Sequence, residues 1–350
     1  MRRSRHARSA ITGTVVVGAA LFALAAAPPG AQAAASYKPA VNASATLGAQ
    51  PADSPLDLTY VDSIYINDLV RGGGHTFAIT LDVAQLPNVS TQDVLFSIYD
   101  QTTGWYQNSE TSIPADEFSW STTGLDVTAG ATTITGDAQQ FNVAVSTSAG
   151  ALDFQLTPQG QPLYYGGVGE TNLLGDLNDE WAFPNATTSG TLTADGTTYS
   201  VAGTSWFDRQ WGPEPLLDPT MQWTWMGITL SNGDEVAIWD ILNTSGQNSF
   251  ATVLEPDGTT EVASVTPLAE GAGDYWTSPS TLYSYPTKWE ITIPSLNAHL
   301  IVTKIGTGQE FGQPLAHVEA SGTVTGTFGG AAVTGTNFLE NNGNWLFGSL

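Results

Sequence analysis

Cysteine is absent from the 350-residue sequence. Its absence excludes disulfide bonds, thiolate metal sites, a cysteine nucleophile and a lipid-modified cysteine, so packing alone must hold the chain together. Histidine is almost as rare, with four residues, and neither an HExxH nor a GxSxG motif occurs. A zinc hydrolase or a serine hydrolase therefore has no support in the sequence.

Positive charge is scarce, because nine lysines and arginines stand against 33 aspartates and glutamates, giving a net charge of −24. Four of the nine lie within the first eight residues, which leaves five cations beyond residue 35: Lys38, Arg71, Arg209, Lys288 and Lys304. Nucleic acids and anionic membranes are bound through neutralised phosphates, so this chain repels them. We expect no nucleic-acid partner.

Long apolar runs are limited to one, from Ala10 to Ala27, which follows the arginines and precedes Ala31-Gln32-Ala33. A basic start, an apolar run and a small-residue cleavage site are typical of a secretory signal peptide, so we predict that residues 1–35 are removed and the protein is secreted. No later run reaches the roughly 18 residues of a membrane span. Residues 36–55, rich in Ala, Ser and Pro, are expected to form a flexible tether.

Helical periodicity is weak along the rest of the chain, and only the segments near 170–181 and 213–221 are compatible with short helical turns. Residues 75–86, 94–99 and 141–156 are instead rich in β-branched and aromatic residues between turn signals. Many short strands at this spacing predict an all-β chain of antiparallel sandwiches or barrels. Three dipeptides that suit type I′ turns predict hairpins: Asp195-Gly196, Asn232-Gly233 and Asp257-Gly258.

The hairpin around Asn232-Gly233 is the most informative of the three. A two-residue loop would place Trp225 opposite Asp240 and Met226 opposite Trp239. Both faces of that hairpin are apolar, so we expect both to be buried, for example between a pocket and a second domain. Asp240 is then a carboxylate among tryptophans.

The densest aromatic cluster runs from Trp206 through Asp208 and Arg209 to Trp211, and Trp223 and Trp225 follow it. Indole rings form an apolar wall, and a carboxyl group desolvated by them has a raised pKa, so it can donate a proton near neutral pH. The alternative interpretation is a structural ion pair between Asp208 and Arg209 that caps a tryptophan-rich core.

Other candidates are weaker. Tyr164-Tyr165-Gly166-Gly167 offers glycines for a close approach to a ligand, but a β-bulge explains them equally well and is favoured. Asp176, Asn178, Asp179 and Glu180 carry oxygen ligands, yet they lack the spacing of a calcium-binding EF-hand loop, so no metal site is predicted. The histidines His75, His299 and His317 are far from one another in sequence. Three polar residues late in the chain are expected at the surface: Gln309, Glu310 and Glu340.

The run from Val201 to Gly212 resembles the V-x-G-x-x-W-x-D-x-x-W-G signature of a lipocalin-like family. This family includes carotenoid 1,2-hydratase (hydroxyneurosporene synthase), AttH-type proteins and kievitone hydratase, and more distantly the lipocalin-like Diels-Alderases. Later landmarks are similar in order: Trp223-x-Trp225, Leu230, Gly233-Asp234, Trp276-x-Ser278, Tyr285-Pro286, Trp289, Ile293-Pro294, Gln309-Glu310 and residues 335–340.

The resemblance implies two tandem lipocalin-like β domains, at residues 56–214 and 215–350, with an apolar cavity near their junction. It implies activity on an isoprenoid or polyketide-type molecule, by hydration of a double bond or by cyclisation, without a cofactor. Asp208, Trp211, Trp223 and Trp225 fall on its signature positions. Gln210 departs from the usual acidic or asparagine residue, and no histidine lies near the hairpin, which disfavours carotenoid hydration in particular.

Three functions stay open from the sequence: a hydratase or cyclase, a carrier of an apolar ligand, and a glycan-active protein. A hydratase or cyclase requires a protonated acid beside aromatic walls. A carrier requires the same cavity but no reacting group. A glycan-active protein requires two carboxylates across an open groove. The predicted site joins the catalytic candidates Asp208 and Asp240 to seven residues expected to bind substrate: Trp206, Arg209, Trp211, Trp223, Trp225, Trp239 and Tyr165.

Overall fold

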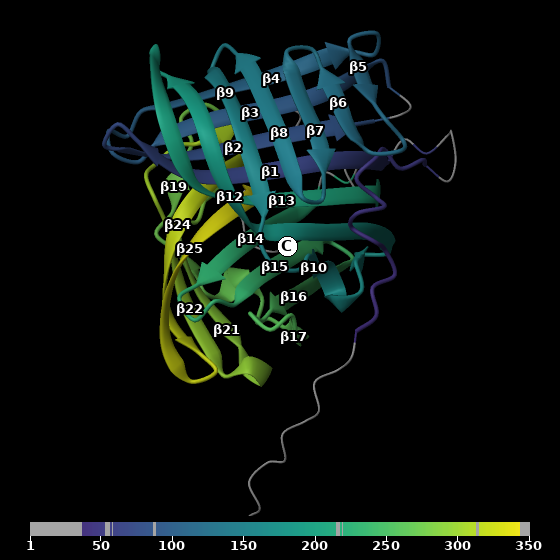
Figure 1. Ribbon diagram of the computed structural model, residues 1–350. Coiled ribbons are helices and arrows are strands. Elements are labelled where there is room, and N and C mark those ends of the chain that lie inside the picture. The colour runs from purple at the N-terminus through teal and green to yellow at the C-terminus, as the bar shows by residue number, and fades with distance from the viewer. Residues whose placement is uncertain are drawn as a thin grey trace, which may run out of the picture. The chain divides into compact units, whose positions relative to one another are not determined.

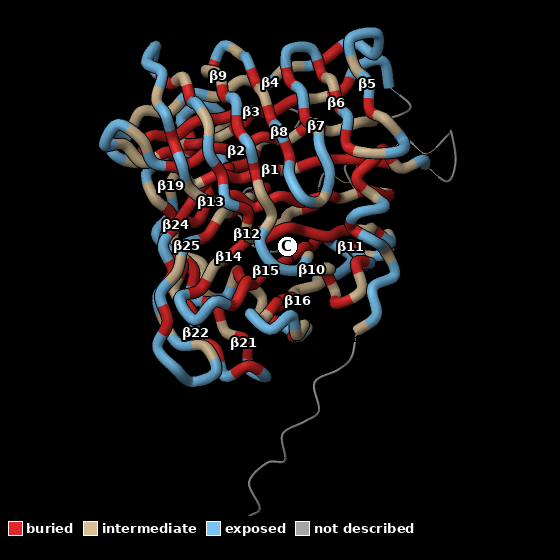
Figure 2. The backbone as a smooth tube through the Cα atoms, in the orientation of Figure 1, coloured by how far each residue is buried: buried red, intermediate tan, exposed pale blue. Residues whose placement is uncertain are grey.

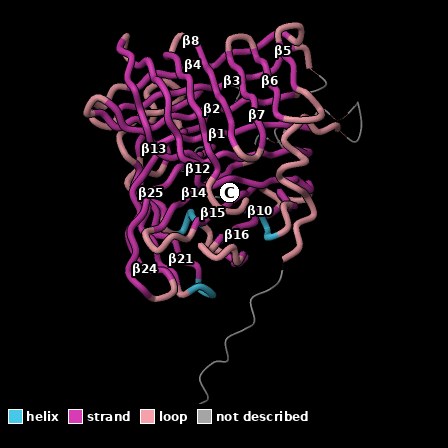
Figure 3. Tube along the Cα trace, in the orientation of Figure 1, coloured by secondary structure: helices cyan, strands magenta, loops and turns pink. Residues whose placement is uncertain are grey.

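The computed structural model describes residues 37–52, 57, 59–86, 89–214, 218, 220–312 and 315–343. Almost all of this chain is strand, and the helical parts are three single 3-10 turns, η1 (Tyr165–Gly167), η2 (Leu268–Glu270) and η3 (Pro294–Leu296) (Figure 3). The predicted all-β class is confirmed. No helix in the described ranges has the length and apolar character to cross a membrane. The predicted signal peptide lies outside these ranges.

The first half of the chain folds into a 13-stranded antiparallel sheet that curls into a nearly closed barrel (Figure 1). The spatial order is β4-β3-β2-β1-β13-β12-β9-β8-β7-β6-β5, and β10 and β11 pair with β12. The strands are β1 (Tyr60–Gly72), β2 (His75–Gln85), β3 (Thr91–Asp100), β4 (Tyr106–Pro114), β5 (Phe118–Trp120), β6 (Leu125–Ala129), β7 (Thr132–Asp137), β8 (Gln140–Thr147), β9 (Gly150–Pro158), β10 (Leu163–Tyr164), β11 (Glu170–Leu173), β12 (Asp176–Ala194) and β13 (Thr197–Pro213).

The second half forms a 10-stranded half-barrel in the order β17-β16-β15-β14-β25-β24-β22-β21-β18, with β23 paired to β24. A separate pair joins β19 to β20. These strands are β14 (Gln222–Leu230), β15 (Glu235–Asn243), β16 (Gly246–Leu254), β17 (Thr260–Ser264), β18 (Ala272–Gly273), β19 (Trp276–Thr277), β20 (Ser284–Tyr285), β21 (Lys288–Ile293), β22 (Ala298–Lys304), β23 (Glu310–Phe311), β24 (His317–Phe328) and β25 (Ala331–Asn342).

Alternation along the strands explains the barrel core. In β9, Leu152, Phe154 and Leu156 are buried, whereas Asp153 and Gln155 between them are exposed. Successive side chains of a strand point to opposite faces, so one face of β9 packs inside the barrel and the other meets water. By contrast, β1 is buried along most of its length (Figure 2), because both of its faces are covered.

Three clusters of buried residues account for this covering. One fills the barrel, a second fills the half-barrel, and a third joins strands of both sheets. The third contains Tyr165, Trp206, Trp225 and Trp239. The chain passes from the first sheet to the second between Pro213 and Gln222. All described residues belong to one compact unit, and the division into domains at residues 56–214 and 215–350 stays a prediction.

Several local expectations are wrong. Residues 170–181 form β11 and the start of β12 rather than a helical turn. The favoured bulge at Tyr164–Gly167 is instead the 3-10 turn η1, in which Gly166 and Gly167 have φ of 63° and 82°. Positive φ at two successive residues needs glycine, and this requirement explains the pair.

The prediction of a flexible tether is also wrong for residues 37–52. Ala43, Leu47 and Ala49 are buried in the barrel cluster. The indole N–H of Trp181 donates to Thr46 Oγ1 at 2.9 Å. Small residues in this segment serve close packing rather than mobility.

Candidate functional site

Strand β13 carries the signature residues, and it presents them to two different environments. Phe207, Arg209 and Trp211 point into the barrel, where Phe207 and Trp211 belong to its core cluster. Asp208 and Gln210 instead line a pocket between the sheets, and Trp206 packs in the cluster that joins the sheets. The six consecutive residues therefore do not form one site, because a strand alternates its side chains.

The pocket lies between β1, β2, β3, β12 and β13 of the barrel and β14, β15, β24 and β25 of the half-barrel, and its volume is about 170 Å³. Its apolar and aromatic lining comes from Val61, Tyr65, Ala84, Leu86, Leu95, Leu173, Met221, Trp223, Trp225, Trp239, Ile241 and Leu315. Its polar lining comes from Ser63, Asp82, Asp93, Glu180, Asp208, Gln210, Glu214, His317, Glu319, Glu340 and Asn342. The expected cavity near the junction exists, but it is richer in carboxyl groups than expected.

Asp208 is held by a short chain of hydrogen bonds. The indole N–H of Trp225 donates to Tyr165 Oη at 2.9 Å, and the Tyr165 hydroxyl donates to Asp208 Oδ1 at 2.9 Å. Burial raises the pKa of Asp208 to about 8, although the neighbouring Trp206 indole and the hydrogen bond from Tyr165 oppose the shift. Asp208 is 3% exposed, so near neutral pH it is a protonated acid at the pocket wall.

Glu180 lies beside Asp208 on the neighbouring strand β12. Its Oε2 accepts a hydrogen bond from the Trp239 indole at 2.9 Å. Burial, followed by the charge of Asp208, raises the pKa of Glu180 well above its usual range. Two carboxyl groups so close favour a state in which at least one keeps its proton.

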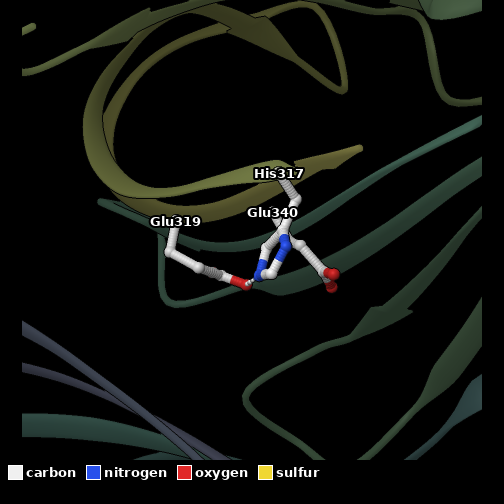
Figure 4. Close-up of side chains that lie close together, drawn as sticks. All are labelled: His317, Glu319 and Glu340. Atoms are coloured by element: carbon white, nitrogen blue, oxygen red, sulfur yellow. Dashed lines mark ion pairs between the residues drawn. The ribbon is translucent and has the colours of Figure 1, made fainter. Parts of the chain in front are cut away.

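The half-barrel contributes His317, Glu319 and Glu340 to the pocket lining, from β24 and β25 (Figure 4). His317 Nε2 lies 3.6 Å from Glu319 Oε1, and His317 Nδ1 lies 2.6 Å from the Leu315 carbonyl oxygen. The Tyr65 hydroxyl donates to Glu319 Oε2. One ligand atom from each of the three residues lies within 4.8 Å of the others, so this trio is where a metal ion would find ligands.

The aromatic floor of the pocket is built edge to face. Trp206 and Trp225 have ring centroids 5.7 Å apart at 81°, and Tyr65 and Trp225 have centroids 5.4 Å apart at 88°. This geometry is the preferred one for aromatic pairs. Gly227 makes it possible, because a Cβ at that position would lie 2.8 Å from Trp225 and 2.9 Å from Trp206.

The ionisable groups that line the pocket are almost all acidic. Seven carboxyl groups and one imidazole line it, and no lysine or arginine occurs among the lining residues of the described chain. Burial and then the neighbouring carboxyl groups of Glu340, Glu214 and Asp93 raise the pKa of Asp82 well above its usual range. Protonation relieves part of this repulsion, and any remaining negative charge disfavours an anionic ligand.

Arg209 and Trp211, which were expected to bind substrate, do not line the pocket. The Arg209 guanidinium lies inside the barrel, 2.5 Å from Asp62 Oδ1, and it donates to the carbonyl of Gly48 at 2.8 Å. Its Cζ lies 4.3 Å from the Trp120 ring centroid and 5.2 Å from that of Trp211. The alternative ion pair with Asp208 is also wrong, because Arg209 pairs with Asp62.

Asp240 is likewise away from the pocket. The hairpin loop has three residues rather than two, with Gly233 at φ 94°, so Trp225 pairs with Trp239 and Thr224 with Asp240. This one-residue change reverses the face of every residue on β15. Asp240 accepts hydrogen bonds from Gln247, Ser249 and the backbone N–H of Leu268, at 2.8, 2.6 and 2.8 Å.

The remaining predicted residues are brought together. Trp223, Trp225 and Trp239 line the pocket, and Trp206 and Tyr165 pack directly behind them. Among the residues considered above as possible calcium ligands, Glu180 lines the pocket.

Sequence reasoning missed His317, Glu319 and Glu340, and placed Glu340 at the surface. The spacing of His317 and Glu319 is a signal, because residues i and i+2 of a strand share a face. Glu340 pairs directly with Glu319 across the sheet. The signal for that pairing is the dipeptide Gly329-Gly330, which suits a two-residue type I′ turn and then places Glu319 opposite Glu340.

Comparison with known proteins gives consistent results. A family model described as AttH-like matches residues 92–344. The dehydratase asqC of Emericella nidulans is 28% identical over 215 residues, which cover 56% of this chain and 60% of the relative. Kievitone hydratase of Fusarium solani subsp. phaseoli is 24% identical over 184 residues, which cover 50% and 51%. The chain thus matches less than two thirds of either relative.

A crystal structure of kievitone hydratase from Nectria haematococca superposes with a TM-score of 0.70 at 20% identity, covering 88% of this chain and 98% of that one. At that identity the likeness establishes the fold. The predicted resemblance to AttH-type proteins and to kievitone hydratase is therefore confirmed.

Proposed function

The chain belongs to the AttH-like family, and from that premise we propose that it adds water to a carbon–carbon double bond of an apolar small molecule, or forms such a double bond by removing water from an alcohol. Two relatives named a dehydratase and a hydratase support this reaction class. The observation that carries the proposal is Asp208, a buried carboxyl group with a pKa near 8 at the wall of a tryptophan-lined pocket.

The reaction begins at Asp208 in the hydration direction. Its proton passes to one alkene carbon, and the adjacent carbon becomes cationic. The indole faces of Trp223, Trp225 and Trp239 stabilise that cation, each by roughly 1–2 kcal/mol when water is excluded. Water then adds to the cation and gives up one proton, which returns through solvent to the Asp208 carboxylate, and elimination is the same path in reverse. If a carbon nucleophile of the substrate replaces water, the same acid initiates a cyclisation.

The lining indicates which substrates fit. Apolar side chains from both sheets suit an isoprenoid or polyketide-type skeleton, and the acidic lining accepts hydroxyl or other donor groups rather than anions. Secretion remains part of the proposal, because the predicted signal peptide lies outside the described residues.

The test is turnover of a panel of alkene and alcohol probes in ¹⁸O-labelled water. The panel contains kievitone, simpler prenylated phenols, linear terpenoid alkenes and β-hydroxy ketones. We expect at least one probe to gain or lose one water, and Asp208→Asn to slow that reaction by about 100-fold or more, the usual contribution of a general acid.

Asp68→Asn is the matched control. Burial raises the pKa of Asp68 to about 7 as well, but this residue is absent from the pocket lining. Its replacement removes a buried acid without touching the pocket, so activity per folded molecule is expected to stay within about twofold of the parent. Probes that bind to the protein and are all recovered unchanged would favour the carrier function instead.

A further inference from the structure

We propose that His317 is the second acid–base group of this pocket, the one that takes the proton of the adding water. The inference rests on the proposed function and deepens it by assigning the water-activating side. In the elimination direction the same residue returns the proton to the leaving hydroxyl group. His317 is 5% exposed and lines the pocket from β24, on the half-barrel side.

The tautomer of His317 is fixed by its backbone partner. His317 Nδ1 lies 2.6 Å from the carbonyl oxygen of Leu315. A carbonyl oxygen only accepts, so Nδ1 carries the hydrogen and donates it. In the neutral ring the lone pair is therefore on Nε2, which is the atom a base needs.

Glu319 is placed to stabilise the charge that forms. Its Oε1 lies 3.6 Å from His317 Nε2, which is longer than an N–H···O hydrogen bond, so the Nε2 lone pair is not consumed by this contact. The Tyr65 hydroxyl donates to the other oxygen, Oε2, and fixes the carboxyl group. Glu340 lies on the paired strand and also faces the imidazole. An imidazolium at His317 is thus formed beside two carboxyl groups.

The acid and the base come from different sheets. Asp208 is on β13 of the barrel, and His317 is on β24 of the half-barrel. Asp208 transfers its proton to one alkene carbon and becomes a carboxylate. The other carbon accepts the water oxygen while His317 Nε2 takes one water proton. Return of that proton from His317 to Asp208 through solvent restores both groups, so the sum is the addition of one water.

The two groups act at separable steps, which gives the experiment. In D₂O, reversible protonation of the alkene by Asp208 exchanges its vinylic hydrogen for deuterium even when water does not add. We expect His317→Gln to lower the hydration rate by about 100-fold, while deuterium exchange into recovered probe stays within about threefold of the parent. Asp208→Asn should lose both. The probe is the panel compound that the parent protein turns over.

Matched variants keep the test informative. His299→Gln removes an exposed histidine of β22 and should change neither readout. If His317→Gln fails to fold, Glu319→Gln serves instead, because it retains an acceptor for Tyr65 but cannot ionise beside the imidazolium that forms. It should slow hydration and leave exchange in place, a split that a purely structural role would not produce.

Three results would overturn the assignment. Hydration at the parental rate in His317→Gln would remove the residue from the reaction while leaving the proposed function intact. Loss of hydration on chelation, restored by Zn²⁺, would make His317, Glu319 and Glu340 metal ligands instead of a base and its partners. A parent protein that neither hydrates nor exchanges any probe would overturn the proposed function and this inference together.

Discussion

Two buried aspartates show how the contacts of a residue decide its role. Asp208 accepts a hydrogen bond from a tyrosine at a pocket wall, whereas Asp240 accepts three hydrogen bonds, including one from the backbone at the start of η2. These three donors satisfy the acceptor oxygens of Asp240. Asp240 therefore fastens η2 to β15, and Asp208 retains a proton that it can give away.

Asp240→Asn is expected to destabilise the fold without reducing turnover. The new amide group would face the N–H of Leu268 or one of the two side-chain donors, which leaves a buried donor without an acceptor at a cost of about 1–3 kcal/mol. Urea denaturation gives the change in the free energy of unfolding, and activity is normalised to folded protein. Abolished turnover in a stably folded Asp240→Asn variant would contradict the assignment of Asp208 as the acid.

At the scale of elements, the strand class and most strand positions follow from the sequence, but the register does not. The alternation of Phe154 with Asp153 and Gln155 is readable because it is local. The hairpin at Asn232-Gly233 is predicted as well, yet its loop has three residues, and nothing local distinguishes that loop from the two-residue form. A two-residue loop would place Asp240 on the same face as Trp225, whereas the three-residue loop places it on the other face. Asp195-Gly196, with φ of 46° and 73°, is the type I′ turn expected.

The site was predictable only in part, for the same reason. Asp208 and the tryptophans stand out by composition, and Arg209 could have been separated from Asp208 by the strand alternation alone. The wall of His317, Glu319 and Glu340 depends on pairing between β24 and β25 and on the approach of two sheets. The Gly329-Gly330 turn indicates the pairing of these two strands, whereas no neighbouring residues indicate the approach of the two sheets.

Strand β14 offers a prediction at this scale, at Gly227. Its replacement by alanine would bring a methyl group to within 3 Å of two indoles in the pocket floor. We expect Gly227→Ala to cost about 1–3 kcal/mol by overpacking and to weaken probe binding, measured by quenching of tryptophan fluorescence. Gly246→Ala, where the nearest atom is 4.0 Å away, is the control. Unchanged binding in Gly227→Ala would show that the indole pair adapts freely.

At the scale of the whole molecule, buried acids set the pH dependence of stability. Burial raises the pKa of Asp68 to about 7 and those of Asp208 and Glu235 to about 8, whereas the unfolded chain releases these protons near pH 4. The folded state then binds more protons than the unfolded state, so stability falls as pH rises. Lys304, whose pKa burial lowers to about 7, opposes this trend only above pH 7.

We therefore expect the protein to be more stable at pH 5 than at pH 7. Each of these carboxyl groups lowers the free energy of unfolding by about 1.4 kcal/mol per pH unit where it is protonated only in the folded state. Thermal unfolding should show a melting temperature at least about 10 °C higher at pH 5 than at pH 7. Asp68→Asn should reduce the slope, because one titrating group is gone, and a melting temperature that rises between pH 5 and pH 7 would refute the argument.

The two-sided character of β13 also matters for engineering. The side chains at positions 207, 209 and 211 are buried inside the barrel, so these positions should tolerate few substitutions. Position 210 faces the reaction chamber and pairs with Ser63 and Glu180 on either side. Substitutions at Gln210 should thus change which molecules the pocket binds while the packing of the barrel core stays unchanged.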